Sequence, residues 1–273
     1  MRLMLHLAAP RAGMVLPFNY QYPLSAAIYK IIERADADYA AYLHNEGYRQ
    51  GGKSFKLFTF SDLHTPFKPA GDRMVLTTDK ATVQVCFYLP QAAENFVRGL
   101  FLNRQLEIAD RQSRVAFTIE QVETIDEGLN LLQPDEDGLV TALLEPLSPL
   151  VVGRKNERGN YDFLGPADDG FLFWLGHNWL EKWASVSGPD SNAMAMLQEN
   201  MRLLALPVKK PLQQRVVAIK AGTAAETKIR GYKNFLLEVK APREVVELGL
   251  GAGCGIYCSQ GMGCVGVVQK GRP

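Results

Sequence analysis

Long apolar runs are missing from this sequence of 273 residues. No stretch approaches the roughly 18 consecutive apolar residues that a membrane-spanning helix needs. Residues 1–17 contain His6, Pro10 and Arg11, where a secretory signal needs an unbroken apolar segment. We therefore expect a cytoplasmic protein with no membrane partner.

Cysteine is also scarce, because the chain contains only Cys86, Cys254, Cys258 and Cys264. The last three fall within eleven residues, but three and five residues separate them and no histidine lies near them in the sequence. Zinc sites normally use four ligands at tighter spacing, so we predict no metal and no cofactor. We interpret the cluster as small, weakly polar side chains that fit between glycines.

The net charge is small, at +1, but it is unevenly distributed. Residues 201–273 contain twelve Lys or Arg and four Glu, so this part carries +8 and the rest carries −7. Such an excess is typical of a surface that binds a polyanion, although a solvated strand face also produces part of it.

The length leaves room for two compact units or one large one. The composition is that of a folded globular protein, since 47% of the residues are hydrophobic and 22% are charged. Apolar periodicity in the first half predicts strands at 2–7, 55–60 and 114–122, helices at 24–35 and 91–103, a short helix that Asp36 or Asp38 caps and Gly47 stops, and a hairpin of 74–78 with 82–88. In the second helix we expect Phe96, Leu100 and Phe101 to point inward. This β-α-β-β-α-β order is ferredoxin-like.

The acidic stretch 123–138 is typical of a connector, and we place a domain boundary there, between residues 1–136 and 137–273. In the second half we predict strands at 139–152, 215–219 and 228–239, a helix at 170–183, and a short helix that Pro242 opens. The predicted fold class is α+β, with two tandem ferredoxin-like (βαββαβ) domains.

Glycine is concentrated near the C-terminus, in Gly249-Leu250-Gly251-Ala252-Gly253-Cys254-Gly255 and in Gly261-Met262-Gly263. Glycines at this density let the backbone approach a ligand and present N–H groups to anionic oxygens. A dinucleotide-binding fingerprint opens a helix after the first strand of a βαβ unit, whereas this segment precedes only a short terminal strand, so we reject that reading. A hairpin with glycines for tight turning is the structural alternative.

Five stretches resemble the endoribonucleases that process CRISPR repeat RNA (pre-crRNA), a family of the repeat-associated RNA-binding (RAMP) superfamily. The stretches follow the family order over nearly the whole chain: Leu16-Pro17-Phe18-Asn19-Tyr20 with Ala27-Ile28-Tyr29-Lys30, Tyr42-Leu43-His44, Lys56-Leu57-Phe58-Thr59-Phe60-Ser61, Leu147-Ser148-Pro149-Leu150, and the terminal glycine pattern. The terminal pattern is shared by the superfamily, whereas the Tyr, His and Lys positions are shared with some cutting members. Nine residues separate Gly251 from Gly261, a longer spacer than is usual in the family, and the basic residue often found there is absent.

The resemblance implies a catalytic set of Tyr29, His44 and Lys56 and a metal-independent cleavage of RNA. In such a reaction the 2′-hydroxyl attacks the adjacent phosphorus and leaves a 2′,3′-cyclic phosphate and a 5′-hydroxyl. His44 would exchange a proton and Lys56 would stabilise the growing oxyanion, while Tyr29 would either donate to a phosphate oxygen or assist the 2′-hydroxyl. The implied partner is CRISPR repeat RNA, and the candidate RNA-binding residues are Lys228, Arg230, Lys233, Lys240, Arg243, Gly249, Gly251, Gly261 and Gly263.

Each candidate also has a structural reading, because His44 can cap a helix, Tyr29 can anchor one and Lys56 can be solvated. We interpret His6, His64 and His177 as structural. The main alternative function is a non-catalytic RNA-binding subunit of a CRISPR effector complex, and a small-molecule binding module is a third that the +8 charge disfavours. Effector-complex subunits and a second copy of the chain, in a homodimer, are further candidate partners.

Overall fold

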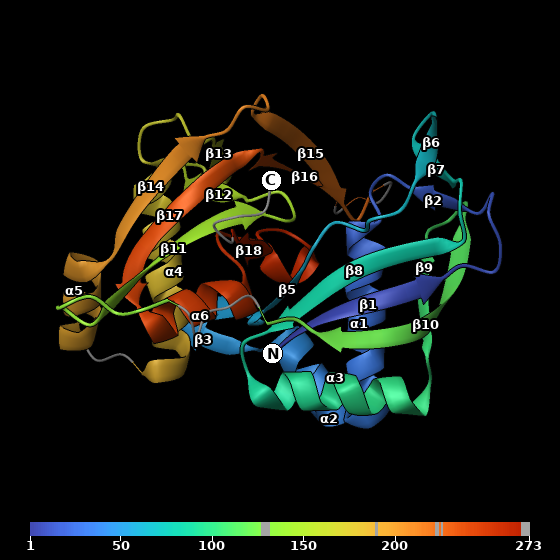
Figure 1. The fold of residues 1–273 in the computed structure, drawn as a ribbon, viewed down its shortest axis with the longest axis horizontal. Coiled ribbons are helices and arrows are strands. Elements are labelled where there is room, and N and C mark those ends of the chain that lie inside the picture. The colour runs from blue at the N-terminus through green and yellow to red at the C-terminus, as the bar shows by residue number, and fades with distance from the viewer. Residues whose placement is uncertain (127–131, 189–190, 222–223, 225, 269–273) are drawn as a thin grey trace.

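Two antiparallel sheets lie side by side in the computed structural model, and their edge strands β5 and β18 lie with α6 near the centre of the view (Figure 1). The structure describes residues 1–126, 132–188, 191–221, 224 and 226–268. The N-terminal half contains β1 (Arg2–Ala8), β2 (Val15–Pro17), α1 (Gln21–Ala35), α2 (Ala37–Asn45), β3 (Tyr48–Gln50), β4 (Lys53–Phe55), β5 (Phe58–Phe60), β6 (Phe67–Ala70), β7 (Arg73–Leu76), β8 (Lys80–Phe87), α3 (Pro90–Leu102), β9 (Gln105–Ala109) and β10 (Arg114–Thr124).

The C-terminal half follows after Leu139. It contains β11 (Leu139–Pro146), β12 (Val152–Lys155), β13 (Tyr161–Leu164), α4 (Phe171–Ser187), α5 (Ser191–Asn200), β14 (Arg202–Pro207), β15 (Gln213–Ile219), β16 (Thr227–Lys233), β17 (Phe235–Pro242), α6 (Arg243–Ala252), the short 3-10 helix η2 (Cys258–Gln260) and β18 (Val265–Val267). Among the described residues, none of these helices has the length and apolar character needed to cross a membrane.

Both halves use the same strand order. In the first, β1, α1, β5, β8, α3 and β10 form a β-α-β-β-α-β unit whose antiparallel sheet has the order β5-β8-β1-β10, and β9 adds an edge strand. In the second, β11, α4, β14, β17, α6 and β18 give the antiparallel order β14-β17-β11-β18. Numbered by their order along the chain, the four strands of each unit therefore lie across the sheet in the order 2-3-1-4. This order confirms the prediction of two ferredoxin-like units in an α+β fold. The predicted boundary at 136/137 stays a prediction, and residues 127–131 lie outside the described part.

The predicted helices form because their apolar faces cover the sheets. α1 buries Leu24, Ile28 and Ile31 completely, and the Asp36 side chain caps α2 by accepting a hydrogen bond from the Tyr39 N–H at 2.9 Å.

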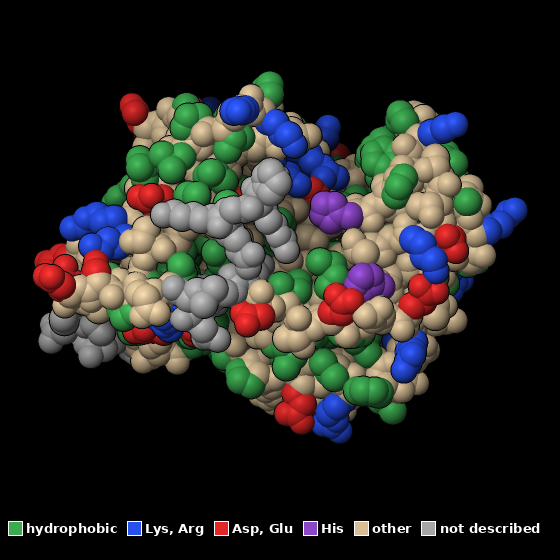
Figure 2. All heavy atoms as spheres, in the orientation of Figure 1, with side chains coloured by type: hydrophobic (Ala, Val, Ile, Leu, Met, Phe, Trp, Pro, Cys, Tyr) green, Lys and Arg blue, Asp and Glu red, His purple; other side chains and the backbone are tan. Residues whose placement is uncertain are grey.

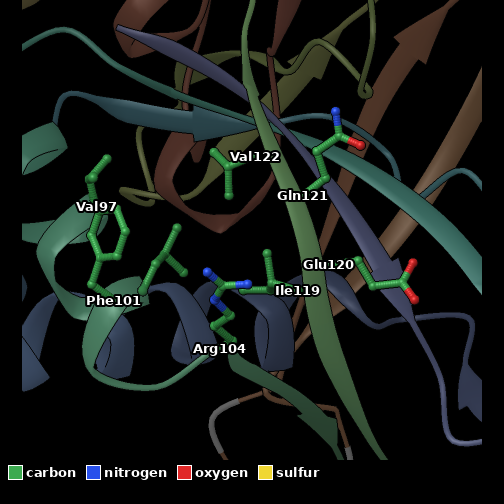
Figure 3. Close-up of a pocket in the computed structure, with 8 residues that line it drawn as sticks. Val97, Phe101, Arg104, Ile119, Glu120, Gln121 and Val122 are labelled. Carbon is green, nitrogen blue, oxygen red and sulfur yellow. The ribbon is translucent and has the colours of Figure 1, made fainter.

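The predicted inward orientation of Phe101 is wrong, because 78% of this side chain is exposed. It lies at the outer end of α3 and lines a hollow between α3 and β10 (Figure 3).

The predicted strand at 55–60 is interrupted, and the interruption has a physical cause. Phe55 and Leu57 pack into the core of the C-terminal half, whereas Phe58 and Phe60 pack into the core of the N-terminal half. The chain passes from one core to the other at Leu57, whose φ of 53° is incompatible with a regular strand. Lys56 therefore lies in a connection between β4 and β5 rather than at the start of a strand.

Two other strand predictions are wrong in their pairing. The predicted hairpin of 74–78 with 82–88 does not form, because β7 pairs with β2 and β6 while β8 pairs with β1 and β5. The predicted strand at 228–239 is divided at Asn234, where φ is 62°, so that β16 belongs to a hairpin with β15 and β17 belongs to the main sheet.

The β15–β16 hairpin docks on the N-terminal half through Asp62, the second residue after β5. One carboxylate oxygen of Asp62 accepts a hydrogen bond from Arg215 at 2.9 Å, and the other accepts one from Lys233 at 2.6 Å. The Arg215 guanidinium also lies 5.8 Å from the centre of the Tyr20 ring. The Asp62 side chain is 14% exposed, so this ion pair network is better shielded from water than a surface pair.

We expect Asp62→Ala to lower the free energy of unfolding by about 1–3 kcal/mol, because two partly buried cations lose their partner. Urea denaturation followed by tryptophan fluorescence measures this change. The matched control is Asp79→Ala, since Asp79 is 48% exposed and lies 4.0 Å from Lys80, and it should change stability by less than about 0.5 kcal/mol. Equal effects of the two substitutions would show that the Asp62 network adds nothing to the docking of the hairpin.

Candidate active site

Tyr29 and His44 come from two successive helices and meet where these helices pack together. The ring centroids are 5.2 Å apart at an interplanar angle of 81°, an edge-to-face contact. The Tyr29 ring also makes an edge-to-face contact with Phe58 of β5, with 5.3 Å between the ring centroids. Tyr29 is half-buried, and burial raises the pKa of its phenol while the Ser259 side chain acts in the opposite direction. His44 is exposed, and its Nδ1 lies 3.0 Å from the Asn45 side-chain oxygen.

Lys56 reaches the same region from the connection between β4 and β5. Its side chain lies over Gly47, three residues after His44, where a Cβ would come within 2.9 Å of Lys56 Cδ and 3.1 Å of Nζ. The ammonium group donates to Ser54 Oγ at 3.1 Å. Partial burial, followed by the nearby Arg49, lowers the pKa of Lys56, while Glu46 raises it. The structure thus brings the three predicted catalytic residues into one region, and their catalytic role stays a prediction.

The segment after α6 closes this region from the C-terminal half. Ser25, one helical turn before Tyr29, donates a hydrogen bond to the Ser259 carbonyl at 2.6 Å. On the β5 side, Thr59 donates to the Met262 carbonyl at 2.9 Å. Residues 253–263, which we call the glycine-rich loop, are therefore attached to both α1 and β5 and place Ser259 beside the Tyr29 phenol.

Lys182 of α4 forms hydrogen bonds with the glycine-rich loop. Only 4% of this lysine is exposed, and its ammonium group donates to the carbonyls of Gly253 and Gly255, both at 2.7 Å, and to Cys258 Sγ at 3.1 Å. Three acceptors match the three N–H donors of an ammonium group, which offsets part of the cost of burying the charge. Sequence reasoning missed Lys182, although a signal existed: it occupies the core position that follows Leu175 and Trp179 along the buried face of α4.

The glycines predicted to contact RNA are buried and closely packed. Gly249 and Gly251 lie in the last turns of α6, the helix that Pro242 was predicted to open. None of the four glycines has room for a Cβ atom. A Cβ at Gly249 would lie 1.9 Å from Trp179, and one at Gly251 would lie 2.8 Å from Tyr88. A Cβ at Gly261 would lie 2.4 Å from Phe60, and one at Gly263 would lie 1.9 Å from Cys254. For Gly249 and Gly263 this packing is within the C-terminal half, and for Gly251 and Gly261 it is between the two halves. Close packing is sufficient to explain their presence, and contact with RNA stays a prediction.

The predicted basic residues divide into two groups. Lys228 and Arg230 are exposed on β16, where Lys and Arg side chains gather over the hairpin (Figure 2). Lys233 pairs with Asp62, Lys240 pairs with Asp135 at 2.6 Å, and Arg243 donates to the Leu132 carbonyl at 2.6 Å. These three cations have close structural partners, whereas Lys228 lies 3.9 Å from Glu226 and its side chain is 72% exposed, so Lys228 and Arg230 are better placed to meet a polyanion.

The three remaining histidines have local partners, as expected for structural residues. His6 lies 3.3 Å from Glu123 and His177 lies 3.4 Å from Glu181, while His64 joins Thr82 through backbone hydrogen bonds. Within the described ranges, no three His, Cys, Asp or Glu side chains are grouped so that they could hold a metal ion.

Two family models match successive parts of the chain. The first is described as the N-terminal part of CRISPR-associated protein Cas6 and matches residues 15–123. The second is described as the C-terminal part of the same protein and matches residues 133–267.

Curated proteins and solved structures are also similar to this chain. The CRISPR-associated endoribonuclease Cas6 of Pyrococcus furiosus is 25% identical over 257 residues, which cover 92% of this chain and 83% of that protein. The CRISPR-associated endoribonuclease Cas6 1 of Methanocaldococcus jannaschii is 35% identical over 97 residues, a match that spans only 36% of that protein. The solved structure of a Cas6-related protein from Pyrococcus furiosus has a TM-score of 0.77 at 19% identity and covers 99% of both chains. An RAMP protein that binds different RNA substrates has a TM-score of 0.72 at 18% identity, over 98% of this chain and all of the other, so these two likenesses establish the fold.

We expect Gly249→Ala to destabilise the protein by about 1–3 kcal/mol, because the added methyl group overlaps the Trp179 ring and forces the two helices apart. Thermal unfolding followed by tryptophan fluorescence measures the change. The matched control is Gly176→Ala in α4, where a Cβ would lie 3.4 Å from Leu203 Cδ1, and it should be neutral or slightly stabilising. If Gly249→Ala keeps wild-type stability and loses RNA binding, Gly249 contacts RNA and its packing role is secondary.

Proposed function

Because the chain belongs to the Cas6 family of CRISPR-associated proteins, we propose that it is an endoribonuclease that cuts CRISPR repeat RNA to make guide RNAs. The observation that supports this proposal is the ring contact of Tyr29 with His44, with Lys56 over Gly47 in the segment that follows His44. Two curated relatives that match this chain are named as endoribonucleases of this family. A histidine, a phenol and a cation in one exposed region match the needs of RNA cleavage by its own 2′-hydroxyl.

The proposed reaction is a transesterification that needs no metal ion. The 2′-oxygen forms a bond to the adjacent phosphorus, and the bond from phosphorus to the 5′-oxygen breaks. The proton of the 2′-hydroxyl passes to a base, and the departing 5′-oxygen receives a proton from an acid. The products are a 2′,3′-cyclic phosphate and a 5′-hydroxyl.

His44 is the residue that exchanges a proton in this scheme, because an imidazole ring can both accept and donate a proton and this side chain is exposed at the surface. Tyr29 is a donor rather than a base, since burial raises the pKa of its phenol and keeps the group protonated at neutral pH. It would donate a hydrogen bond to a phosphate oxygen. Lys56 supplies positive charge where the oxyanion grows.

We expect His44→Ala to slow single-turnover cleavage by about 10²-fold or more, the usual effect of removing an acid–base group, with little change in RNA affinity. Cleavage of labelled repeat RNA in excess EDTA measures the rate, and the wild type should remain active there. The matched control is His64→Ala, because this histidine is exposed and held through its backbone.

Three outcomes would contradict the proposal at different points. A wild-type rate for His44→Ala would move the chemistry to another residue. Cleavage of RNA with a 2′-deoxy group at the cut site would require a nucleophile other than the 2′-hydroxyl. A wild type that binds repeat RNA and never cuts it, in EDTA or with magnesium, would be a non-catalytic subunit of an effector complex.

The role of Lys56 predicts a specific pH dependence. Burial and Arg49 lower the pKa of Lys56, so it loses its proton at a lower pH than an ordinary lysine. As the pH rises, the wild-type cleavage rate should therefore begin to decrease at a pH lower than the ordinary lysine pKa of about 10.4. Lys56→Arg should keep its rate to higher pH because a guanidinium stays protonated. Single-turnover rates at increasing pH, corrected for alkaline hydrolysis of RNA without enzyme, measure this decrease for both proteins. If the rates of the wild type and of Lys56→Arg decrease over the same pH range, Lys56 is not the titrating group.

A further inference from the structure

A cleft of about 420 Å³ adjoins the candidate active site, between the two halves. Lys56 and Phe58 line it from the N-terminal half, and the glycine-rich loop, α4 and the β12–β13 hairpin line it from the other half. Its volume falls within the range of small-molecule sites, about 300–1,000 Å³. A group bound in this cleft would lie next to Lys56, so the cleft is continuous with the region where we place the cleaved phosphate.

The charged groups that line this cleft all have the same sign. Among the described lining residues there are four lysines, Lys53, Lys56, Lys155 and Lys182, and no aspartate or glutamate. Lys53 is neutralised by Glu181 at 2.5 Å, and all three donors of Lys182 bind the glycine-rich loop, so neither ammonium group is available for direct contact with a ligand. Lys155 is exposed at the end of β12 and can reach a bound group directly. The cleft therefore favours an anion.

Two tyrosines form an aromatic wall in the same cleft. The rings of Tyr161 and Tyr257 have centroids 6.3 Å apart at 73°. Tyr161 is fixed against the backbone of Gly153, where a Cβ would come within 2.8 Å of its ring. Tyr257 has φ of 62°, a left-handed conformation that is costly for a residue with a side chain. Such strain is commonly found where a side chain must point into a binding site.

Aromatic rings beside lysines, with no carboxylate, match the chemistry of a nucleotide. A base can stack on a tyrosine while its phosphate meets a lysine, as occurs widely in proteins that bind single-stranded nucleic acid. We propose that this cleft holds one unpaired nucleotide of the RNA next to the cleaved bond, with its base on Tyr161 and Tyr257 and its phosphate at Lys155. This inference rests on the proposed function, and it assigns to Tyr161, Tyr257 and Lys155 a binding role separate from the catalytic set.

The test combines abasic RNA with protein variants. Single abasic sites are scanned through the nucleotides on both sides of the cleaved bond, and affinity is measured by fluorescence anisotropy. For the wild type, one position should weaken binding by about tenfold, the usual effect of losing one stacked base. Tyr161→Ala should weaken binding of intact RNA by a similar factor and should then be insensitive to that abasic site. Tyr161→Phe should bind as the wild type does, because it keeps the ring.

The matched control is Phe101→Ala, which removes an exposed ring that lines the hollow between α3 and β10 instead of the cleft. It should leave both the affinity and the abasic sensitivity unchanged. Should Tyr161→Ala fail to fold, Lys155→Ala and a wild-type measurement replace it. In that measurement, 2-aminopurine at the sensitive position should show quenched fluorescence on binding.

Two results would overturn the inference while leaving the proposed function intact. The first is a wild type that cuts repeat RNA and tolerates an abasic site at every position. The second is full additivity of the Tyr161→Ala and abasic effects, because two groups that touch must be coupled. A wild type that neither binds nor cuts intact repeat RNA would instead count against the proposed function itself.

Discussion

The ammonium group of Lys182 lies inside the protein, where a charge is costly unless its hydrogens are bonded. Its acceptors are two carbonyls and one sulfur of the glycine-rich loop, so the path of that loop is set by the position of α4. The loop in turn places Ser259 against α1 and Met262 against β5. One buried cation of the C-terminal half thereby helps to hold the loop that packs beside Tyr29, a residue of the N-terminal half. The three catalytic candidates all belong to the N-terminal half, and the C-terminal half supplies the loop that packs beside them.

Much of the fold could be predicted because it follows from local patterns. The apolar stripe of α1 and the alternation in β1 report directly which face meets the sheet. The break at Leu57 could not be predicted, since nothing in the residues 53–60 shows that Phe55 and Phe58 enter different cores. The division at Asn234 is similar, because one continuous β-prone stretch is shared between two sheets. Pairing between distant strands depends on the whole chain, so sequence periodicity identifies strands better than it identifies their neighbours.

The candidate site shows a comparable division. Tyr29, His44 and Lys56 were identified through a family resemblance, and the structure explains how three separate segments converge. Charge alone was a weaker guide: Lys233 and Lys240 were counted as free cations but neutralise Asp62 and Asp135. Tyr161 and Tyr257 were missed because single tyrosines in a loop and a hairpin form no sequence pattern. Their significance arises only from the contact between the two segments.

The identical strand order of the two halves makes their connections directly comparable. In each half, a segment links the second helix to the last strand of the unit. In the first half, this link becomes β9, which adds an edge strand beside β10 and shields part of its outer side. In the second half, the equivalent link is the glycine-rich loop, which turns away from its own sheet and fills the junction. At this matching position the two halves of a repeated architecture therefore differ: the link of the first half extends its own sheet, whereas the link of the second half is bonded to α1 and β5 of the other half.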